Sequence, residues 1–185
     1  MSEPFRSPLA ADANAGRVVL VTGGGTGIGR ATALAFAGSG AKVAICGRRP
    51  APLEAARAAL EALGAEVLVH PADVREPEQV VGLVDAVLGR FGAIDVLVNN
   101  AGGQFVSPLE AISLKGWRAV HRLNVDAVWD LTREVAERSM IPRRGGLVGT
   151  LGHSPRRGSP RRAHSAAAPA ARQNLAGARA VTGRR

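Results

Sequence analysis

The chain has 185 residues, of which 46% are hydrophobic and 21% charged, a composition typical of one soluble globular domain with its own core. A formal net charge of +9 suggests a nucleic acid or a membrane surface as partner only if the charge is spread over the fold. Residues 143–185 contain ten arginines and no acidic residue, which leaves 14 basic and 15 acidic side chains in residues 1–142. The body of the protein is therefore close to neutral, and only its C-terminal segment is basic.

The single cysteine, Cys46, excludes an internal disulfide and a metal site built from cysteines, as is usual in a reducing compartment. The first twenty residues lack the continuous apolar run of a secretory signal, and no stretch of about 18 apolar residues indicates a membrane span. We expect a cytoplasmic protein without a membrane partner.

Segments typical of strands and of helices alternate along the chain. Short apolar runs predict strands at 17–23, 41–47, 66–70 and 93–102, and apolar residues at helical spacing predict helices at 28–40, 52–63 and 77–90. The strand predicted at 93–102 is apolar through its middle, which is typical of a strand buried on both faces. The pattern favours an α/β fold in which helices wrap both faces of a doubly wound parallel sheet.

The pattern changes in the second half of the chain. A long helix is expected from Ser113 to about Arg138, with Trp117 and Leu131 on one broad face, and a weak, glycine-containing fifth strand at 145–151. Beyond it Ser, Pro, Arg, Gly and Ala dominate. We expect three parts: a flexible segment at 1–16, a nucleotide-binding domain at 17–142, and a basic, poorly ordered segment at 143–185.

The loop "TGGGTGIG", Thr22 to Gly29, lies between the first predicted strand and the first predicted helix. Glycines at this position let the backbone approach a pyrophosphate held at the helix N-terminus. The alternative is a tight turn that only allows close packing of the helix.

Together with "NNAGG" at 99–103, this loop resembles the short-chain dehydrogenase/reductase family. The resemblance implies a Rossmann-type sheet, here incomplete at its C-terminal side, a nicotinamide cofactor, a small-molecule substrate and a homo-oligomer. It places one group of residues around the pyrophosphate, a second beside adenine and a third along the cleft. These are Gly23, Thr26, Gly27, Ile28 and Gly29; Asp73 and Val74 of "PADV"; and Asn100, Ala101 and Gly102. For Asp73, a solvated loop or a helix N-cap is the alternative.

The second predicted strand ends in "ICGRR", without the acidic residue that would bind both hydroxyls of the adenosine ribose. Arg48 and Arg49 stand there instead, and guanidinium groups pair well with a 2′-phosphate. The sequence thus predicts NADP(H) as the cofactor. Two arginines solvated at a strand end are the alternative.

Residues 102–125, "GGQFVSPLEAISLKGWRAVHRLNV", are similar to the enoyl-CoA and dienoyl-CoA reductase branch of the family. That branch reduces a carbon–carbon double bond in acyl-CoA thioesters. Asn124 matches the helix asparagine that holds a water of the proton relay in the wider family; a buried amide at a helix distortion is the alternative.

The catalytic part departs from the family. Most members use a serine and then Tyr-x-x-x-Lys, but the chain contains no tyrosine. Aligning "AHSAAAPAARQNL" with the family helix places Ser165 at the tyrosine position and Pro169 at the lysine position. Two further family strands have no counterpart in this pattern, which a frameshift, gene decay or a functional basic tail would explain.

Three hypotheses follow. The first is an NADP(H)-dependent reductase of an enoyl-CoA-like substrate, and the second is a cofactor-binding protein without turnover that pairs with an intact paralogue. The third is binding of anions or nucleic acids by the basic segment, which ranks last because no aromatic residue is interleaved with the arginines.

Overall fold

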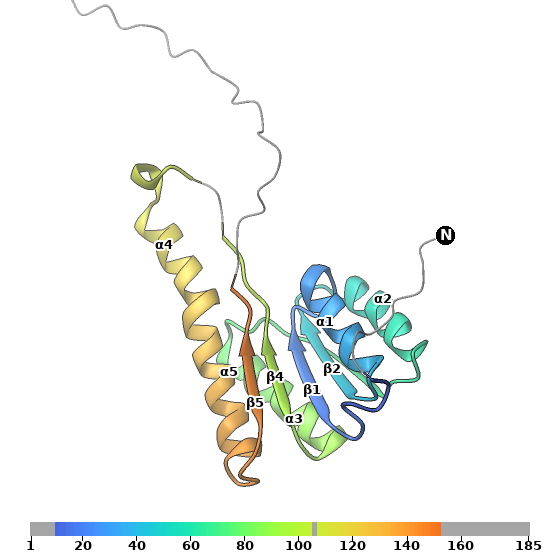
Figure 1. The fold of residues 1–185 in the computed structure, drawn as a ribbon. Helices are drawn as coiled ribbons and strands as arrows, with labels where there is room; N and C mark the ends of the chain where they lie inside the picture. Colours follow the sequence, from blue (N-terminus) through green and yellow to red (C-terminus); the bar gives the residue numbers. More distant parts are fainter. Residues whose placement is uncertain (1–9, 105–106, 153–185) are drawn as a thin grey trace, which may run out of the picture. The chain divides into compact units, whose positions relative to one another are not determined.

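A computed structural model describes residues 10–104 and 107–152, whose fold Figure 1 shows. They form a five-stranded sheet in the order β3-β2-β1-β4-β5, and all neighbours are parallel. The strands are β1 (Val18–Thr22), β2 (Lys42–Gly47), β3 (Val67–Pro71), β4 (Val96–Asn99) and β5 (Leu147–Thr150). The helices are α1 (Gly27–Ala37), α2 (Pro50–Glu61), α3 (Pro77–Phe91), α4 (Leu114–His121) and α5 (Ala127–Val135). Shorter helical segments are η1 (Leu109–Ala111), η2 (Arg122–Asp126) and η3 (Ala136–Met140).

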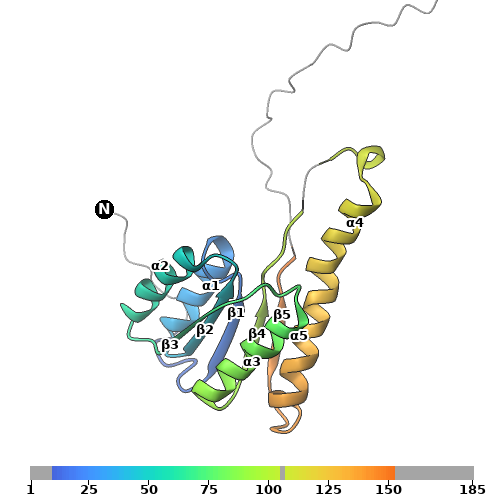
Figure 2. The same cartoon turned by 180° about the vertical axis from the view of Figure 1, so that it is seen from behind.

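Helices cover both faces of the sheet (Figures 1 and 2). Each face has its own apolar core. Val19 and Val96 pack on the face of α1 and α2, whereas Leu20 and Leu97 pack on the face of α3 and α5. Successive residues of a strand point to opposite faces, so a strand covered on both sides has to be apolar throughout. The predicted α/β, doubly wound parallel fold is therefore confirmed.

The predicted helix boundaries need three corrections. α1 spans Gly27–Ala37 rather than 28–40, because the helix already ends at the C-cap residue Gly38. α2 spans Pro50–Glu61 rather than 52–63, because Pro50 occupies the first helical position, where its fixed φ is already suitable. The long helix is continuous from α4 to η3, but η2 and η3 are wider π-type turns. Trp117 is 55% exposed, and the buried side of the helix begins at Ala127.

Residues 10–16, expected to belong to a flexible segment at 1–16, form turns against the end of α1. The Asn14 amide N–H donates to the Ser39 carbonyl oxygen at 2.8 Å, and Asn14 Nδ2 donates to Ser39 Oγ at 2.8 Å. The Ser39 side chain is buried. Contacts of the domain thus extend to the N-terminal side of Arg17, a long-range effect that the local composition did not indicate.

The expected fifth strand is present as β5, which pairs with β4 through Leu147 opposite Val96. It lies within 143–185, so that segment is not uniformly unstructured, and the domain extends beyond residue 142. The reason is the backbone pairing with β4, which outweighs the poor strand propensity of the glycines. Residues 153–185 lie outside the described residues.

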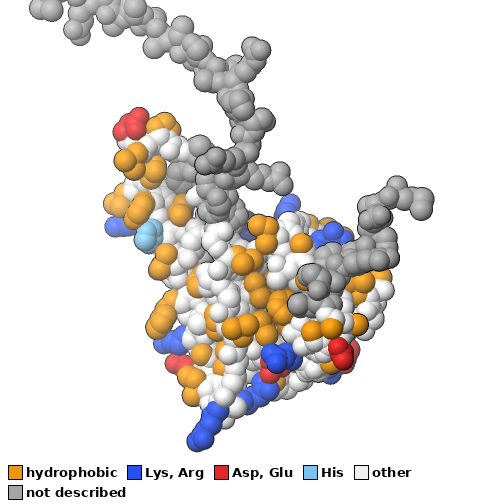
Figure 3. All heavy atoms as spheres, in the orientation of Figure 1, with side chains coloured by type: hydrophobic (Ala, Val, Ile, Leu, Met, Phe, Trp, Pro, Cys, Tyr) orange, Lys and Arg blue, Asp and Glu red, His pale blue; other side chains and the backbone are white. Residues whose placement is uncertain are grey.

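One part of the sheet keeps apolar side chains at the surface. Leu147 shares the face of α1, yet its side chain is 60% exposed, and Val148 on the same strand is 39% exposed. Hydrophobic side chains gather between α1 and the α4–α5 helix in Figure 3. Within the described part of the chain, α1 and α2 cover the other strands of that face but not β5.

The ends of three strands are joined by Asp95, directly before β4. Its Oδ2 accepts from the Val18 amide at 2.8 Å, and its Oδ1 accepts from Arg143 Nη2 at 2.7 Å. Its carbonyl oxygen also accepts from the Leu147 amide at 2.9 Å. The Asp95 carboxylate therefore ties the start of β1 to the residue before β4, and the Asp95 backbone oxygen ties the start of β5 to the same point.

We expect Asp95→Ala to lower the free energy of unfolding by about 1.5–3 kcal/mol, because a charged acceptor of a backbone amide is lost. Arg143→Ala, which removes only the exposed partner, should cost about 0–1 kcal/mol. Urea unfolding followed by circular dichroism measures both values. Equal losses for the two variants would show that the contact with Val18 contributes nothing.

Candidate cofactor site

After β1 and after β4, which are neighbours in the sheet, the chain turns toward opposite layers of helices. β1 leads into α1 on one face, and β4 leads toward the α4–α5 helix on the other. In open α/β sheets, ligands bind in the crevice that forms where the strand order reverses in this way. The loop from Thr22 to Gly29 lies at this point.

Two different constraints favour glycine in this loop: close packing against neighbouring atoms and a positive φ. A Cβ on Gly29 would lie 2.3 Å from Asn100 Nδ2 and 2.4 Å from the Gly23 oxygen, so the start of α1 touches the neighbouring backbone. Gly23 and Gly27 have φ values of 66° and 56°, which favour glycine. A Cβ on Gly27 would have no neighbour within 4 Å, so the turn at the N-terminus of α1 faces open space.

This combination fits a bound pyrophosphate. Tight packing of α1 explains Gly29, but it does not explain a positive φ at Gly27 beside open space. Amide groups at a helix N-terminus bind phosphate oxygens, and a loop without side chains lets them come close. Thr26 and Ile28, both expected near the pyrophosphate, are exposed at the same opening.

Thr22 joins the loop after β1 to the loop after β4. Its buried Oγ1 accepts from the Asn100 amide at 2.9 Å and from the Ala101 amide at 2.8 Å, and it donates to the Val98 oxygen at 3.3 Å. The Asn100 side chain completes the connection by donating to the Thr22 oxygen at 2.8 Å. Thr22 was not among the residues predicted to bind the cofactor, although a polar residue at the end of a buried apolar strand was an available signal.

One residue predicted beside adenine and one predicted along the cleft come together around a shallow hollow. Val74, from the loop after β3, and Ala101, from the loop after β4, line it together with Thr22 and Leu123. Gly102, next in the chain, is exposed. Segments far apart in the sequence thus form one wall of the site.

Charged residues surround the ends of β2 and β3. Arg48 and Arg49 are exposed directly after β2, and Asp73 follows β3 with a side chain that is 17% exposed. Arg75 donates through Nε to Asp73 Oδ1 at 2.9 Å and through Nη2 to Oδ2, and its amide also donates to Oδ1. These hydrogen bonds, together with the charges of Arg75 and Arg48, hold the pKa of Asp73 below its usual value although burial opposes this.

Asn124 lies in η2, and both polar atoms of its side-chain amide bond to backbone groups. Its Nδ2 donates to the Gly103 oxygen at 2.8 Å and to the Val120 oxygen at 2.9 Å, while its Oδ1 accepts from the Gly103 amide at 3.2 Å. The widened turn therefore places Asn124 against the loop after β4. Ser165, the other expected catalytic residue, lies outside the described residues.

Other kinds of site find no support in the described residues. Burial raises the pKa of the Cys46 thiol to about 12, against a weaker lowering by a hydrogen bond with the Gly23 backbone, so Cys46 is not a nucleophile. Within residues 10–104 and 107–152, no group of three or more His, Cys, Asp or Glu is placed to bind a metal ion. No helix of the described part is long and apolar enough to cross a membrane.

Fold and loop together define a nucleotide-binding α/β protein. The family model "short chain dehydrogenase" matches residues 17–180, a range that includes most of the basic segment. The chain belongs to the short-chain dehydrogenase family of oxidoreductases, which bind a nicotinamide cofactor.

Relatives within the family carry different names. The peroxisomal 2,4-dienoyl-CoA reductase of Arabidopsis thaliana is 42% identical over 122 residues, which are 66% of this chain and 40% of that protein. The gluconate 5-dehydrogenase of Gluconobacter oxydans is 39% identical over 133 residues, 72% of this chain and 52% of that protein. The chain thus spans about half the length of the curated relatives it matches.

Solved structures agree with the fold. A citronellol catabolism dehydrogenase of Pseudomonas aeruginosa has a TM-score of 0.73 and 39% identity, over 79% of this chain and 59% of the other. An NAD+-bound xylitol dehydrogenase has a TM-score of 0.72 and 34% identity, over 75% of this chain and 53% of the other.

We expect Gly29→Ala to weaken binding of NADPH and NADH alike by at least about tenfold, because the added methyl group pushes the Gly23 backbone out of position. Gly82→Ala in α3 is the matched control: a Cβ there meets no atom within 4 Å, so stability should rise by up to about 1 kcal/mol without a change in binding. Fluorescence titration and urea unfolding measure these effects. Unchanged binding by Gly29→Ala would remove the loop from the site.

Proposed function

We propose that the protein is an NADP(H)-dependent oxidoreductase of the branch that reduces an enoyl-CoA-like substrate by hydride transfer. The observation that carries the cofactor choice is the pair Arg48 and Arg49, exposed at the end of β2, in a site whose glycine loop fits a pyrophosphate. An acidic residue there would repel a 2′-phosphate, whereas guanidinium groups bind it with charge-assisted hydrogen bonds.

Each group of residues has a distinct task in this proposal. Amides of the loop from Gly23 to Gly29 bind the pyrophosphate, and Asp73 and Val74 lie beside the adenine ring. Ala101 and Gly102 let the ribose and the nicotinamide lie close to the end of β4. The bound nicotinamide supplies the hydride.

The proton that must follow the hydride requires an oriented donor. In the proposed site the side chain of Asn124 fixes the Gly103 backbone. The second lone pair of Asn124 Oδ1 then accepts a hydrogen bond from a water molecule. Ser165 is the proposed hydroxyl partner of that water. Asn124 therefore orients the relay and does not itself exchange a proton.

The substrate proposal rests on residues 102–125 and on relatives that are named dienoyl-CoA reductases, in Arabidopsis thaliana and, at 32% identity over 168 residues, in Pongo abelii. Other relatives are named for gluconate and glucose. We propose an acyl-CoA thioester with a conjugated double bond, because hydride addition to it leaves a negative charge that the thioester oxygen can carry.

A second candidate, cofactor binding without turnover, is favoured by one observation: the 185 residues include no tyrosine. Pro169, which takes the place of the family lysine in the alignment, supplies no cation for the nicotinamide ribose. This candidate keeps the entire cofactor site and differs only in its catalytic rate.

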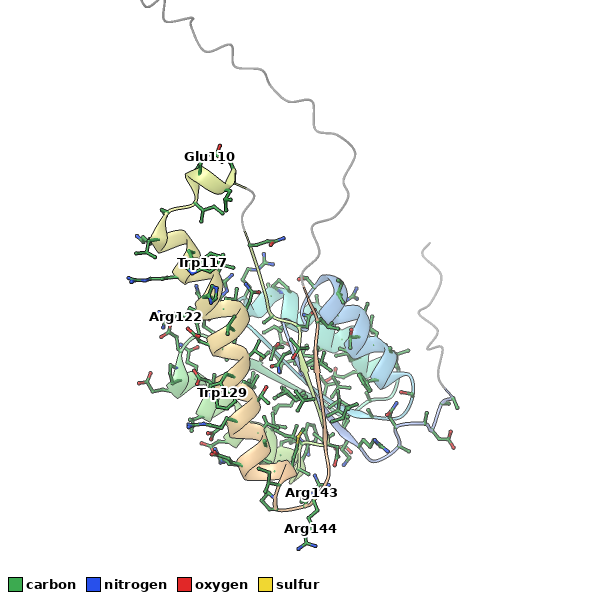
Figure 4. All side chains as sticks on the ribbon, turned by 60° about the vertical axis from the view of Figure 1, so that its left-hand side comes forward. Glu110, Trp117, Arg122, Trp129, Arg143 and Arg144 are labelled. Carbon is green, nitrogen blue, oxygen red and sulfur yellow. The ribbon has the colours of Figure 1, made fainter. Side chains whose placement is uncertain are left out.

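We also propose a homo-oligomer in the cytoplasm. The apolar side of the α4–α5 helix, where Trp117 and Trp129 are 55% and 65% exposed (Figure 4), supports self-association. The named peroxisomal relatives make a peroxisomal location the alternative.

We expect the chain to bind NADPH at least about tenfold more tightly than NADH, and the double variant Arg48→Ala, Arg49→Ala to abolish this preference, since two charge-assisted pairs are removed. Protein fluorescence titrated with each cofactor measures it. Arg57→Ala on the far side of α2 is the control for a lost arginine and should leave the ratio unchanged. Equal affinities in the unaltered chain would refute the choice of NADP(H).

We expect the chain to oxidise NADPH with crotonyl-CoA at a rate at least about 10²-fold below an ordinary 1–10 s⁻¹, because the general acid of the family is absent. Pro169→Lys alone should restore little, because it supplies a cation without a proton donor. Absorbance at 340 nm follows the reaction. Turnover at the ordinary rate would exclude the second candidate and show that Ser165 or another group replaces the tyrosine.

A further inference from the structure

The guanidinium group of Arg75 binds both carboxylate oxygens of Asp73, which lies in the same loop. Arg75 reaches both carboxylate oxygens with Nε, at 2.9 and 3.2 Å, and Oδ2 also with Nη2. Its backbone amide adds a fourth contact at 3.1 Å. A carboxylate offers about four acceptor positions, so nearly all of its capacity is used by one arginine.

The surrounding structure fixes this loop in place. Gln79 Oε1, from α3, accepts from the Asp73 amide at 2.8 Å, and Arg122 Nη2, from η2, donates to the Arg75 oxygen at 3.1 Å. Arg122 also pairs with Glu76 at 3.1 Å, so the next acidic residue of the loop has its own partner. Figure 4 labels Arg122 on the long helix. The pair of Asp73 and Arg75 is thus held from two further elements.

Asp73 lies directly beside the arginines that follow β2. β2 and β3 run parallel and in register up to Gly47 opposite Pro71, and the Ala72 amide donates to the Gly47 oxygen at 3.0 Å. Arg48 and Asp73 therefore leave adjacent strands at the same edge of the sheet. An anion bound by Arg48 comes close to this carboxylate.

A bare carboxylate there would repel a 2′-phosphate, which carries up to two negative charges. Two solvent-screened charges at a protein surface interact by up to about 1 kcal/mol, which is close to a fivefold change in affinity. Neutralising the carboxylate locally removes that penalty.

We propose that Arg75 is a specificity-determining residue: its ion pair with Asp73 cancels the carboxylate charge beside Arg48 and so allows this site to accept a 2′-phosphorylated adenosine. The inference rests on the proposed NADP(H) preference and adds a residue that does not itself touch the phosphate. Asp73 remains beside adenine, and Arg75 lowers the electrostatic penalty for binding a phosphate next to that carboxylate.

Two small probes isolate this effect, because 2′,5′-ADP and 5′-AMP differ only by the 2′-phosphate. Calorimetry with the full chain gives the affinity ratio of the two. Arg75→Gln should reduce the ratio by about fivefold, whereas Arg75→Lys, which keeps the charge, should retain most of it. In an Asp73→Asn background, Arg75→Gln should return the ratio to about that of the unaltered chain, because the carboxylate charge and the charge that cancels it are then both removed.

Arg138→Gln is the matched control, since Arg138 also pairs with two carboxylates, Asp85 and Glu134, on the surface of α3 and the long helix. It should leave the ratio unchanged. Far-ultraviolet circular dichroism and thermal unfolding check that each variant is folded; the Asp73→Asn background provides a second comparison if Arg75→Gln alone is unstable.

The outcomes separate the two levels of the proposal. Equal affinity of the unaltered chain for both probes overturns the NADP(H) assignment and this inference with it. A clear preference for 2′,5′-ADP that Arg75→Gln leaves unchanged overturns this inference alone. The same holds if Arg75→Gln weakens both probes equally, as a purely structural role would, or strengthens both, as release of a blocked Asp73 would.

Discussion

The hydroxyl group of Thr22 is the contact on which the geometry of the site depends. It lies where the two central strands end, and it connects the backbone of the loop after β4 to β1 through three hydrogen bonds. The position of Asn100 follows from this contact, and Asn100 in turn leaves no room for a side chain on Gly29. The close approach of α1 to the sheet, and with it the opening at Gly27, is a consequence of one buried polar group that is fully satisfied.

Charge is distributed around the site in pairs that largely cancel. Arg75 neutralises Asp73 and Arg122 neutralises Glu76, so that the exposed Arg48 and Arg49 dominate the field at the end of β2. The two pairs are also linked, because Arg122 donates to the Arg75 backbone. The helix that carries Asn124 is thereby tied to the loop that carries Asp73, and the two ends of the expected cofactor site share one rigid support.

Much of the fold could be predicted from the sequence, because the signals were local. β4 is an unbroken apolar run that ends in "NNAG", and both features follow from burial on two faces and a tight approach at the strand end. The π-type turn around Asn124 was indicated only as the alternative of an amide at a helix distortion, since a widened turn depends on contacts with Gly103 rather than on helix propensity. The fork of Arg75 on Asp73 and the turns at Asn14 were missed for the same reason: each depends on where a neighbouring element lies. The roles of Asn124 and Ser165 remain predictions.

The burial of Cys46 makes it useful for observing motion in this protein. Its side chain is fully buried, its pKa is about 12, and its carbonyl oxygen accepts from the Gly24 amide at the base of the glycine loop. A thiol in this state reacts with alkylating reagents only when the structure around it opens. Because the chain has a single cysteine, the rate of its labelling reports how often β2 and the glycine loop separate, without any engineered probe. Cofactor binding across that loop would lower the labelling rate by a factor that grows with the ratio of the free cofactor concentration to its Kd.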